Sequence, residues 1–175
     1  MTNLHTIVKT FCQKARPGWV VLLVTIVLVL IEVFFNHLFF FFKITHESNL
    51  PFILPTSHID VALYVFIRIV KACILAPIIE TLIFQYLMYE ILSVKFRLRK
   101  EIFIFISAVL FGLSHYTSYT TVIVTSVLCV VLNYFYVVLI ELNPKNRAFL
   151  IIALIHSSLN ACVFLDQYYE LYFNR

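Results

Sequence analysis

Long apolar runs dominate the chain, and short polar segments separate them. The first run covers residues 19–42 and follows three basic residues. Its 24 residues exceed the roughly 7–15 apolar residues of a signal peptide, so it predicts a retained membrane helix. Further apolar runs cover residues 61–94, 102–118, 121–140 and 149–165. The pattern therefore predicts an all-α fold, a polytopic transmembrane bundle of about five spans.

The second run, residues 61–94, is too long for a simple span. At a rise of about 1.5 Å per residue it would measure about 51 Å, against a hydrocarbon core of about 30 Å. Dividing it at Pro77 would leave two pieces that are each too short to cross. We therefore expect one long helix that is kinked near Pro77 and begins at the outer membrane interface.

The composition agrees with a membrane protein and excludes several other classes. Of the 175 residues, 62% are hydrophobic and 13% are charged, whereas soluble domains carry about 25% charged residues. The abundance of Phe and Tyr, with only 2 Gly, excludes a disordered or collagen-like chain. The 4 cysteines lie far apart without a C-x-x-C pair, which favours reduced thiols over a disulfide or metal framework.

The basic residues predict the orientation. Of the 13 Lys and Arg residues, 9 fall before the first run, within residues 95–101 or within residues 141–148. A five-span arrangement puts these segments on one side, and cytoplasmic loops carry an excess of Lys and Arg. We expect a multi-pass protein of the cell membrane with its N-terminus in the cytoplasm and its C-terminus outside. The net charge of +4 thus reflects topology and predicts no nucleic-acid partner, and residues 1–175 are expected to form a single membrane domain.

Ionisable groups inside membrane helices are costly, so each is a candidate for function. Three of them are Glu80, His115 and His156. Helical spacing places Asn160 on the same face as His156, and Phe111 on the same face as His115. Counted along their helices, the four polar groups lie at similar depths, between the midplane and the outer half of the bilayer. A carboxylate, two imidazoles and an amide can activate water and stabilise an oxyanion, which predicts a hydrolytic site.

In their order along the chain these residues resemble the CPBP family of intramembrane proteases, also called the CAAX-protease and bacteriocin-processing or Abi family. Glu80 follows an Ala-Pro pair as the family's first motif commonly does, and F-x-x-x-H and H-x-x-x-N follow on separate predicted helices. The match covers roughly residues 70–165. The resemblance implies that Glu80 activates the attacking water, that His115 helps to hold it, and that His156 and Asn160 stabilise the oxyanion.

The first motif departs from the family pattern E-E-x-x-x-R. Thr81 stands at the second glutamate and Gln85 at the arginine. These positions are four apart, where a helical ion pair can form, so the charges are lost together and a neutral pair that could hydrogen-bond remains. The leading interpretation is an intramembrane endopeptidase acting on a membrane-associated peptide or protein. The alternative is a non-catalytic family member, a bacteriocin-immunity or membrane scaffold protein.

No cofactor is expected, because the family resemblance is taken here to imply a glutamate-type mechanism without metal. Glu80, His115 and His156 would also suit zinc, so a metal site stays open as an alternative. A rhomboid-like serine dyad is not expected, since no G-x-S-x-G motif or serine–base spacing occurs. A small transporter subunit is disfavoured, because neither a repeat nor a pair of broken helices is visible.

Overall fold

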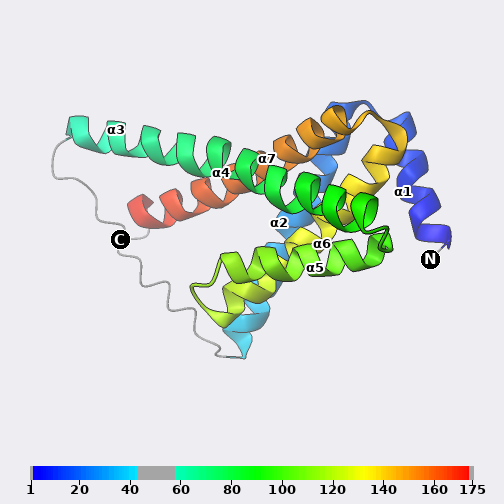
Figure 1. The fold of residues 1–175 in the computed structure, drawn as a ribbon. Coiled ribbons are helices and arrows are strands. Elements are labelled where there is room, and N and C mark those ends of the chain that lie inside the picture. Colours follow the sequence, from blue (N-terminus) through cyan, green and yellow to red (C-terminus); the bar gives the residue numbers. More distant parts are fainter. Residues whose placement is uncertain (1, 43–57, 174–175) are drawn as a thin grey trace.

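The computed structural model describes residues 2–42 and 58–173, and every regular element within these ranges is helical (Figure 1). This confirms the predicted all-α class. Elements marked η are π-helical, with wide turns closed by hydrogen bonds to the fifth residue along. The elements are α1 (Thr2–Lys14), α2 (Pro17–Phe41), α3 (His58–Ile69), η1 (Val70–Leu75), α4 (Ala76–Glu80), η2 (Thr81–Leu87), η3 (Glu90–Lys95), α5 (Lys100–Ser114), α6 (Tyr119–Leu142) and α7 (Lys145–Phe173).

Three of the described helices are long and apolar enough to cross a membrane: α2, α6 and α7 as far as Tyr169. A membrane bundle therefore fits the chain. The segments from α3 to η3 form one long helix of mixed α and π geometry (Figure 1). Helix α5 has 15 residues, about 22 Å at the α-helical rise, which is shorter than a typical hydrocarbon core of about 30 Å. The count of five spans stays a prediction.

The long helix passes Pro77 without a break. The wide turns of η1 end at Leu75, two residues before the proline, and the Ala76 N–H donates to the carbonyl oxygen of Lys71, five residues back. Proline lacks an N–H, so a helix must rearrange its hydrogen bonds around it. The irregularity that the sequence predicts at Pro77 thus includes a π-helical segment immediately before it. Wide turns return in η2, directly after Glu80.

Helix α6 is the central helix of the bundle. Half of its most apolar stretch is buried, against 39% for α7 and 22% for α2. Tyr136 and Leu132 on α6 lie in one apolar core with Leu28 of α2, Phe103 of α5 and Ile155 of α7. The outer faces of α2 and α7 stay apolar and exposed, as expected of helices that contact lipid.

A close contact between α5 and α6 depends on Gly112. A Cβ atom at this position would lie 1.9 Å from Ser126 Oγ and 2.6 Å from the carbonyl oxygen of Val122. Only glycine lets the two helices approach this closely, as small residues commonly do in membrane bundles. The turn that follows is capped by Ser118, whose Oγ accepts a hydrogen bond of 3.1 Å from the Thr121 N–H. Gly112 thus permits the close approach of α5 to α6, and Ser118 caps the start of α6.

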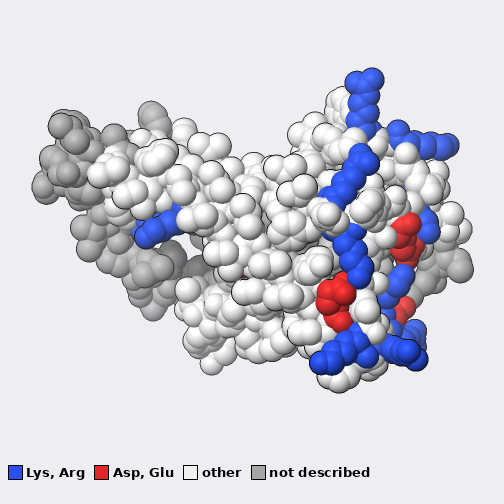
Figure 2. Space-filling view, turned by 45° about the horizontal axis from the view of Figure 1, so that its top comes forward, with Lys and Arg blue, Asp and Glu red and all other residues white. Residues whose placement is uncertain are grey.

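The three basic segments of the sequence lie at one end of the molecule. Helix α1, the turn between η3 and α5, and the turn between α6 and α7 share this end in Figure 1. Figure 2 shows most of the visible Lys and Arg side chains gathered there, with a few acidic side chains among them. Which side of the membrane this end faces stays a prediction.

Ion pairs tie the helices together at this basic end. Glu141 of α6 accepts from Lys9 at 2.8 Å and from Lys100 at 2.6 Å, which joins α1 and α5 to α6. Glu90 accepts from Lys145 of α7 at 2.5 Å. This ion pair joins the long helix to α7.

Candidate active site

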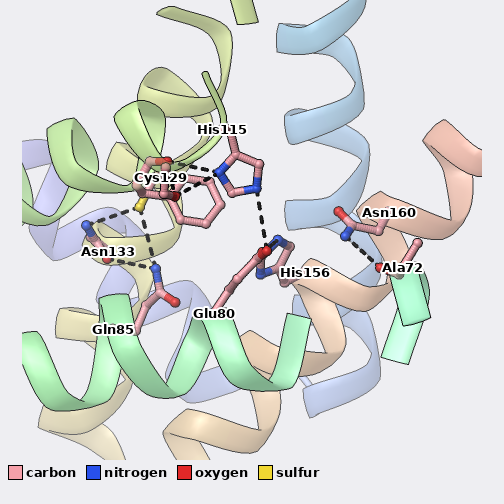
Figure 3. Close-up of polar contacts among 10 residues, drawn as sticks. Ala72, Glu80, Gln85, His115, Cys129, Asn133, His156 and Asn160 are labelled. Carbon is pink, nitrogen blue, oxygen red and sulfur yellow. Dashed lines mark hydrogen bonds and ion pairs between the residues drawn. The ribbon is translucent and has the colours of Figure 1, made fainter. Parts of the chain in front are cut away.

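Glu80 ends α4 and faces two histidines from two other helices. Its Oε1 lies 3.5 Å from Nε2 of His115, and its Oε2 lies 3.4 Å from Nε2 of His156. Figure 3 shows the three side chains meeting between the long helix, the end of α5 and α7. The structure thus brings together three residues that are 35 or more positions apart in the sequence.

A contact with the backbone of its own helix fixes the orientation of the His115 ring. It follows the last residue of α5, and its Nδ1 lies 2.9 Å from the carbonyl oxygen of Phe111. A carbonyl oxygen can only accept, so Nδ1 carries the proton in this contact. Nε2 is therefore directed at Glu80, or at a water molecule between the two groups. Ser114 Oγ lies 3.2 Å from the same Nδ1.

His156 lies much deeper than its two partners. It is 3% exposed, whereas the side chains of Glu80 and His115 are 21% and 32% exposed. No described residue forms a hydrogen bond with His156 Nδ1. The three groups thus form a site that is open on the side of His115 and closed on the side of His156.

Phe111 packs against both imidazoles. Its ring centroid lies 4.4 Å from that of His115 and 5.8 Å from that of His156. Phe84, one turn beyond Glu80, meets Phe111 edge to face at 5.1 Å. The phenylalanine of the F-x-x-x-H motif therefore contacts both histidines. These contacts restrict the rotation of the two imidazole rings.

Asn160 is placed one helical turn beyond His156 and is engaged elsewhere. Its Nδ2 donates to the carbonyl oxygen of Ala72 in η1, at 2.9 Å (Figure 3). In the π-helical pattern Ala72 would accept from residue 77, and Pro77 has no N–H to give. Asn160 thus satisfies a carbonyl that the proline leaves without its donor. The Asn160 amide retains a second N–H that this bond does not use.

Thr81 and Gln85 do not bond to each other, so the hydrogen bond that their spacing would allow does not form. Both side chains are fully buried, and Thr81 Oγ1 has no hydrogen-bond partner among the described residues. The physical reason is twofold. Both residues lie in the wide turns of η2, where a separation of four no longer stacks side chains as in an α-helix. Gln85 also finds a better partner on α6.

That partner is Asn133, whose Oδ1 accepts from Gln85 Nε2 at 3.0 Å (Figure 3). Both amides also contact the Sγ of Cys129 at 3.5 Å, and Asn133 donates to the carbonyl oxygen of Ile104 at 3.3 Å. We call Gln85, Asn133 and Cys129 the amide cluster. The cluster is buried and joins η2, the segment that follows Glu80, to α5 and α6.

The sequence did not single out Asn133, because this residue belongs to none of the three motifs. The usable signal was an amide in the middle of the run 121–140. Amides in membrane helices commonly form hydrogen bonds across helices. Its partner could not be identified from spacing alone, because the two residues are 48 positions apart.

A metal ion is not supported by the arrangement of donors. In the parts of the chain that the structure covers, no three or more His, Cys, Asp or Glu side chains are arranged to hold one. Each carboxylate oxygen of Glu80 faces a different imidazole, so the group is spread out rather than gathered at one point. The three residues as arranged therefore do not fit a zinc site, and a mechanism without metal stays a prediction.

The arrangement is suited to activating a water molecule. A partly exposed carboxylate beside an imidazole can accept a proton from water that lies between them. A second imidazole, excluded from solvent, can donate to charge that develops on a carbonyl oxygen. Phe111 and the amide cluster hold the surrounding helices in place.

A comparison with protein families agrees with this geometry. The model of the family described as type II CAAX prenyl endopeptidase Rce1-like matches residues 62–162. The match spans more than half of the chain and includes Glu80, His115, His156 and Asn160. No curated protein and no solved structure matches the chain.

Proposed function

Because the chain belongs to the Rce1-like family of type II CAAX prenyl endopeptidases, we propose that it cleaves a membrane-associated peptide or protein with water activated by Glu80. Membership in the family supports a membrane-embedded protease of the CAAX type. The catalytic residues, their roles, the substrate and the orientation in the membrane are part of the proposal.

One observation carries the proposal. A single carboxylate, that of Glu80, lies within 3.5 Å of two imidazoles that come from separate helices. A glutamate that only ties two helices together can do so through one such partner, and a second imidazole in an apolar bundle is costly to bury. This arrangement is better explained by a catalytic role in which both oxygens of the carboxylate take part.

The proposed reaction begins with a water molecule between Glu80 and His115. Glu80 accepts a proton from this water, and the resulting hydroxide attacks the carbonyl carbon of the scissile bond. His156 and the free N–H of Asn160 donate to the oxyanion that forms. Glu80 then gives the proton to the leaving amine as the carbon–nitrogen bond breaks. A carboxylic acid and an amine are released, and Glu80 returns to its starting state.

The substrate class follows from the position of the site. Glu80 and His115 lie toward the end of the bundle that is opposite the basic segments, and they are only partly shielded. This suits a peptide bond in or beside the membrane, such as one in a lipid-attached segment, a C-terminal sorting segment or a leader peptide. With the N-terminus in the cytoplasm, cleavage takes place in the outer half of the bilayer.

A comparison of membrane proteomes tests the proposal. Cells that produce Glu80→Gln in place of the wild-type protein should accumulate one uncleaved precursor. Glu90→Gln is the matched control, because Glu90 lies on the same long helix but pairs with Lys145 outside the site. An identical set of processed proteins in wild-type and Glu80→Gln membranes would contradict the proposal.

The buried Thr81 and Gln85 favour a second candidate function, that of a non-catalytic family member. The first motif lacks its second glutamate and its arginine, and Gln85 is occupied by Asn133. Such a protein would bind a bacteriocin or a membrane partner, acting as an immunity or scaffold protein. Immunity that survives the combined loss of Glu80, His115 and His156 would favour binding over cleavage.

A further inference from the structure

A cavity of about 280 Å³ lies at the basic end of the molecule, and none of its lining residues comes from the long helix that carries Glu80. It is lined by the last turn of α1, the start of α2, the end of α6 and the start of α7. Ligand pockets generally measure roughly 300–1,000 Å³, so this cavity suits a small group rather than a large ligand.

The backbone between α1 and α2 opens this cavity. Arg16 is extended, with φ −65° and ψ 145°, and it separates the two helices. The cause is Pro17, because the residue before a proline avoids the α-helical region. Ala15 and Pro17 line the cavity on either side of this break. The gap is therefore built into the sequence at the junction of α1 and α2.

The polar part of the wall has one charged side chain, and it is positive. Arg147 lines the cavity together with the amides of Gln13 and Asn143, and no acidic residue is part of the wall. Arg147 forms no ion pair with any residue that the structure describes. The acidic residue nearest to Asn143 in the sequence is Glu141, which Lys9 and Lys100 already neutralise.

Apolar side chains from three helices complete the wall. Val20 of α2, Leu139 of α6 and Ile151 of α7 are among them. A cavity lined by one cation, two amides and several aliphatic side chains fits an amphiphile better than a free ion. Basic pockets between membrane helices on the cytoplasmic side commonly hold anionic lipid headgroups.

We propose that this cavity binds the headgroup of an anionic phospholipid, with Arg147 at its phosphate. The surrounding Lys and Arg side chains, visible in Figure 2, raise the local concentration of such lipids. The inference does not depend on the proteolytic activity, because no residue of the cavity belongs to the candidate active site.

Native mass spectrometry of the purified, delipidated protein tests the assignment. Phosphatidylglycerol and phosphatidylcholine with the same acyl chains are added at equal concentration. We expect the protein to retain phosphatidylglycerol preferentially, and Arg147→Ala to reduce this preference about fivefold. Arg97→Ala is the matched control, because Arg97 is an exposed arginine near the same end that does not line the cavity. It should leave the preference unchanged.

Two further measurements test the lipid assignment independently of Arg147→Ala. Asn143→Asp places a carboxylate in the wall and should lower phosphatidylglycerol binding even if Arg147→Ala does not fold. Inorganic phosphate should not displace the lipid at equal concentration. Equal retention of both lipids, equal losses in Arg147→Ala and Arg97→Ala, or displacement by inorganic phosphate would each overturn the assignment.

Discussion

The two oxygens of Glu80 differ in their surroundings. One faces His115 on the partly exposed side of the site, and the other faces His156, which is almost completely buried. A water molecule can reach the first oxygen without passing the second. The two histidines therefore suit different roles, His115 beside the attacking water and His156 at the oxyanion.

The amide cluster permits a test at the level of single residues. Gln85→Leu and Asn133→Leu should each lower the free energy of unfolding by about 1–3 kcal/mol, because each leaves a buried amide without its partner. The double variant should lose less than the sum, since neither amide then remains. Denaturant titration of the protein in detergent measures these values, with Asn36→Leu, an exposed amide on α2, as the control. Strictly additive losses would show that the two side chains do not stabilise each other.

At the level of elements, the irregular long helix is what positions Glu80. The π-helical segments η1 and η2 lie on either side of α4, which ends at Glu80. Wide turns cost hydrogen-bond regularity and are frequent at functional sites. Here Asn160 binds η1 and the amide cluster binds η2, so both irregular segments are attached to neighbouring helices.

The bond between Asn160 and Ala72 can be separated from any chemical role of Asn160. Asn160→Ala should lower the free energy of unfolding by about 1–3 kcal/mol, because the carbonyl of Ala72 loses its donor. In a Pro77→Ala background this loss should shrink, since residue 77 then has an N–H that can donate to Ala72. Denaturant titration of the wild type, the two single variants and the double variant measures the coupling free energy between the two positions. An equal loss in both backgrounds would contradict the account of the wide turn.

Activity in the same four variants separates the two roles. If Asn160 also donates to the oxyanion, the Asn160→Ala variant should stay inactive in the Pro77→Ala background even where stability recovers.

The contact between α5 and α6 gives a matched pair of glycine substitutions. Gly112→Ala should destabilise the protein by about 1–3 kcal/mol, because the added methyl group meets Ser126 and the backbone of α6. Gly18→Ala should change stability by less than about 0.5 kcal/mol, since a Cβ there meets open space. Thermal unfolding followed by circular dichroism compares the two. Equal stability of both variants would show that α5 and α6 do not require the close approach.

At the level of the whole molecule, the charges predict how the bundle sits in the membrane. Single cysteines introduced at exposed positions into a cysteine-free background test this. A membrane-impermeant maleimide should label Thr117→Cys in intact cells, and should label Leu98→Cys only after permeabilisation. The reason is that Leu98 lies between basic residues, at the end that these residues predict to be cytoplasmic. The reverse pattern would contradict the predicted orientation.

The all-α class and the meeting of Glu80, His115 and His156 could be expected from the sequence. Charged or ionisable side chains are conspicuous in apolar runs, and their spacing resembles known motifs. The sequence pattern did not reveal Asn133, because a neutral amide does not interrupt an apolar run. The hydrogen bond from Asn160 to Ala72 could not be predicted either. It depends on π-helical hydrogen bonding around Pro77, which an α-helical period does not reveal.

The most direct test of the central claim is cleavage by the purified protein. The precursor that accumulates in Glu80→Gln membranes is reconstituted into liposomes with the wild-type protein, Glu80→Gln or Glu90→Gln, and the rate of product formation is measured. Wild type and Glu90→Gln should cleave at similar rates, and Glu80→Gln should be slower by a factor of about 10²–10⁴. Cleavage by Glu80→Gln at the wild-type rate would contradict the assignment of Glu80 as the base that activates water.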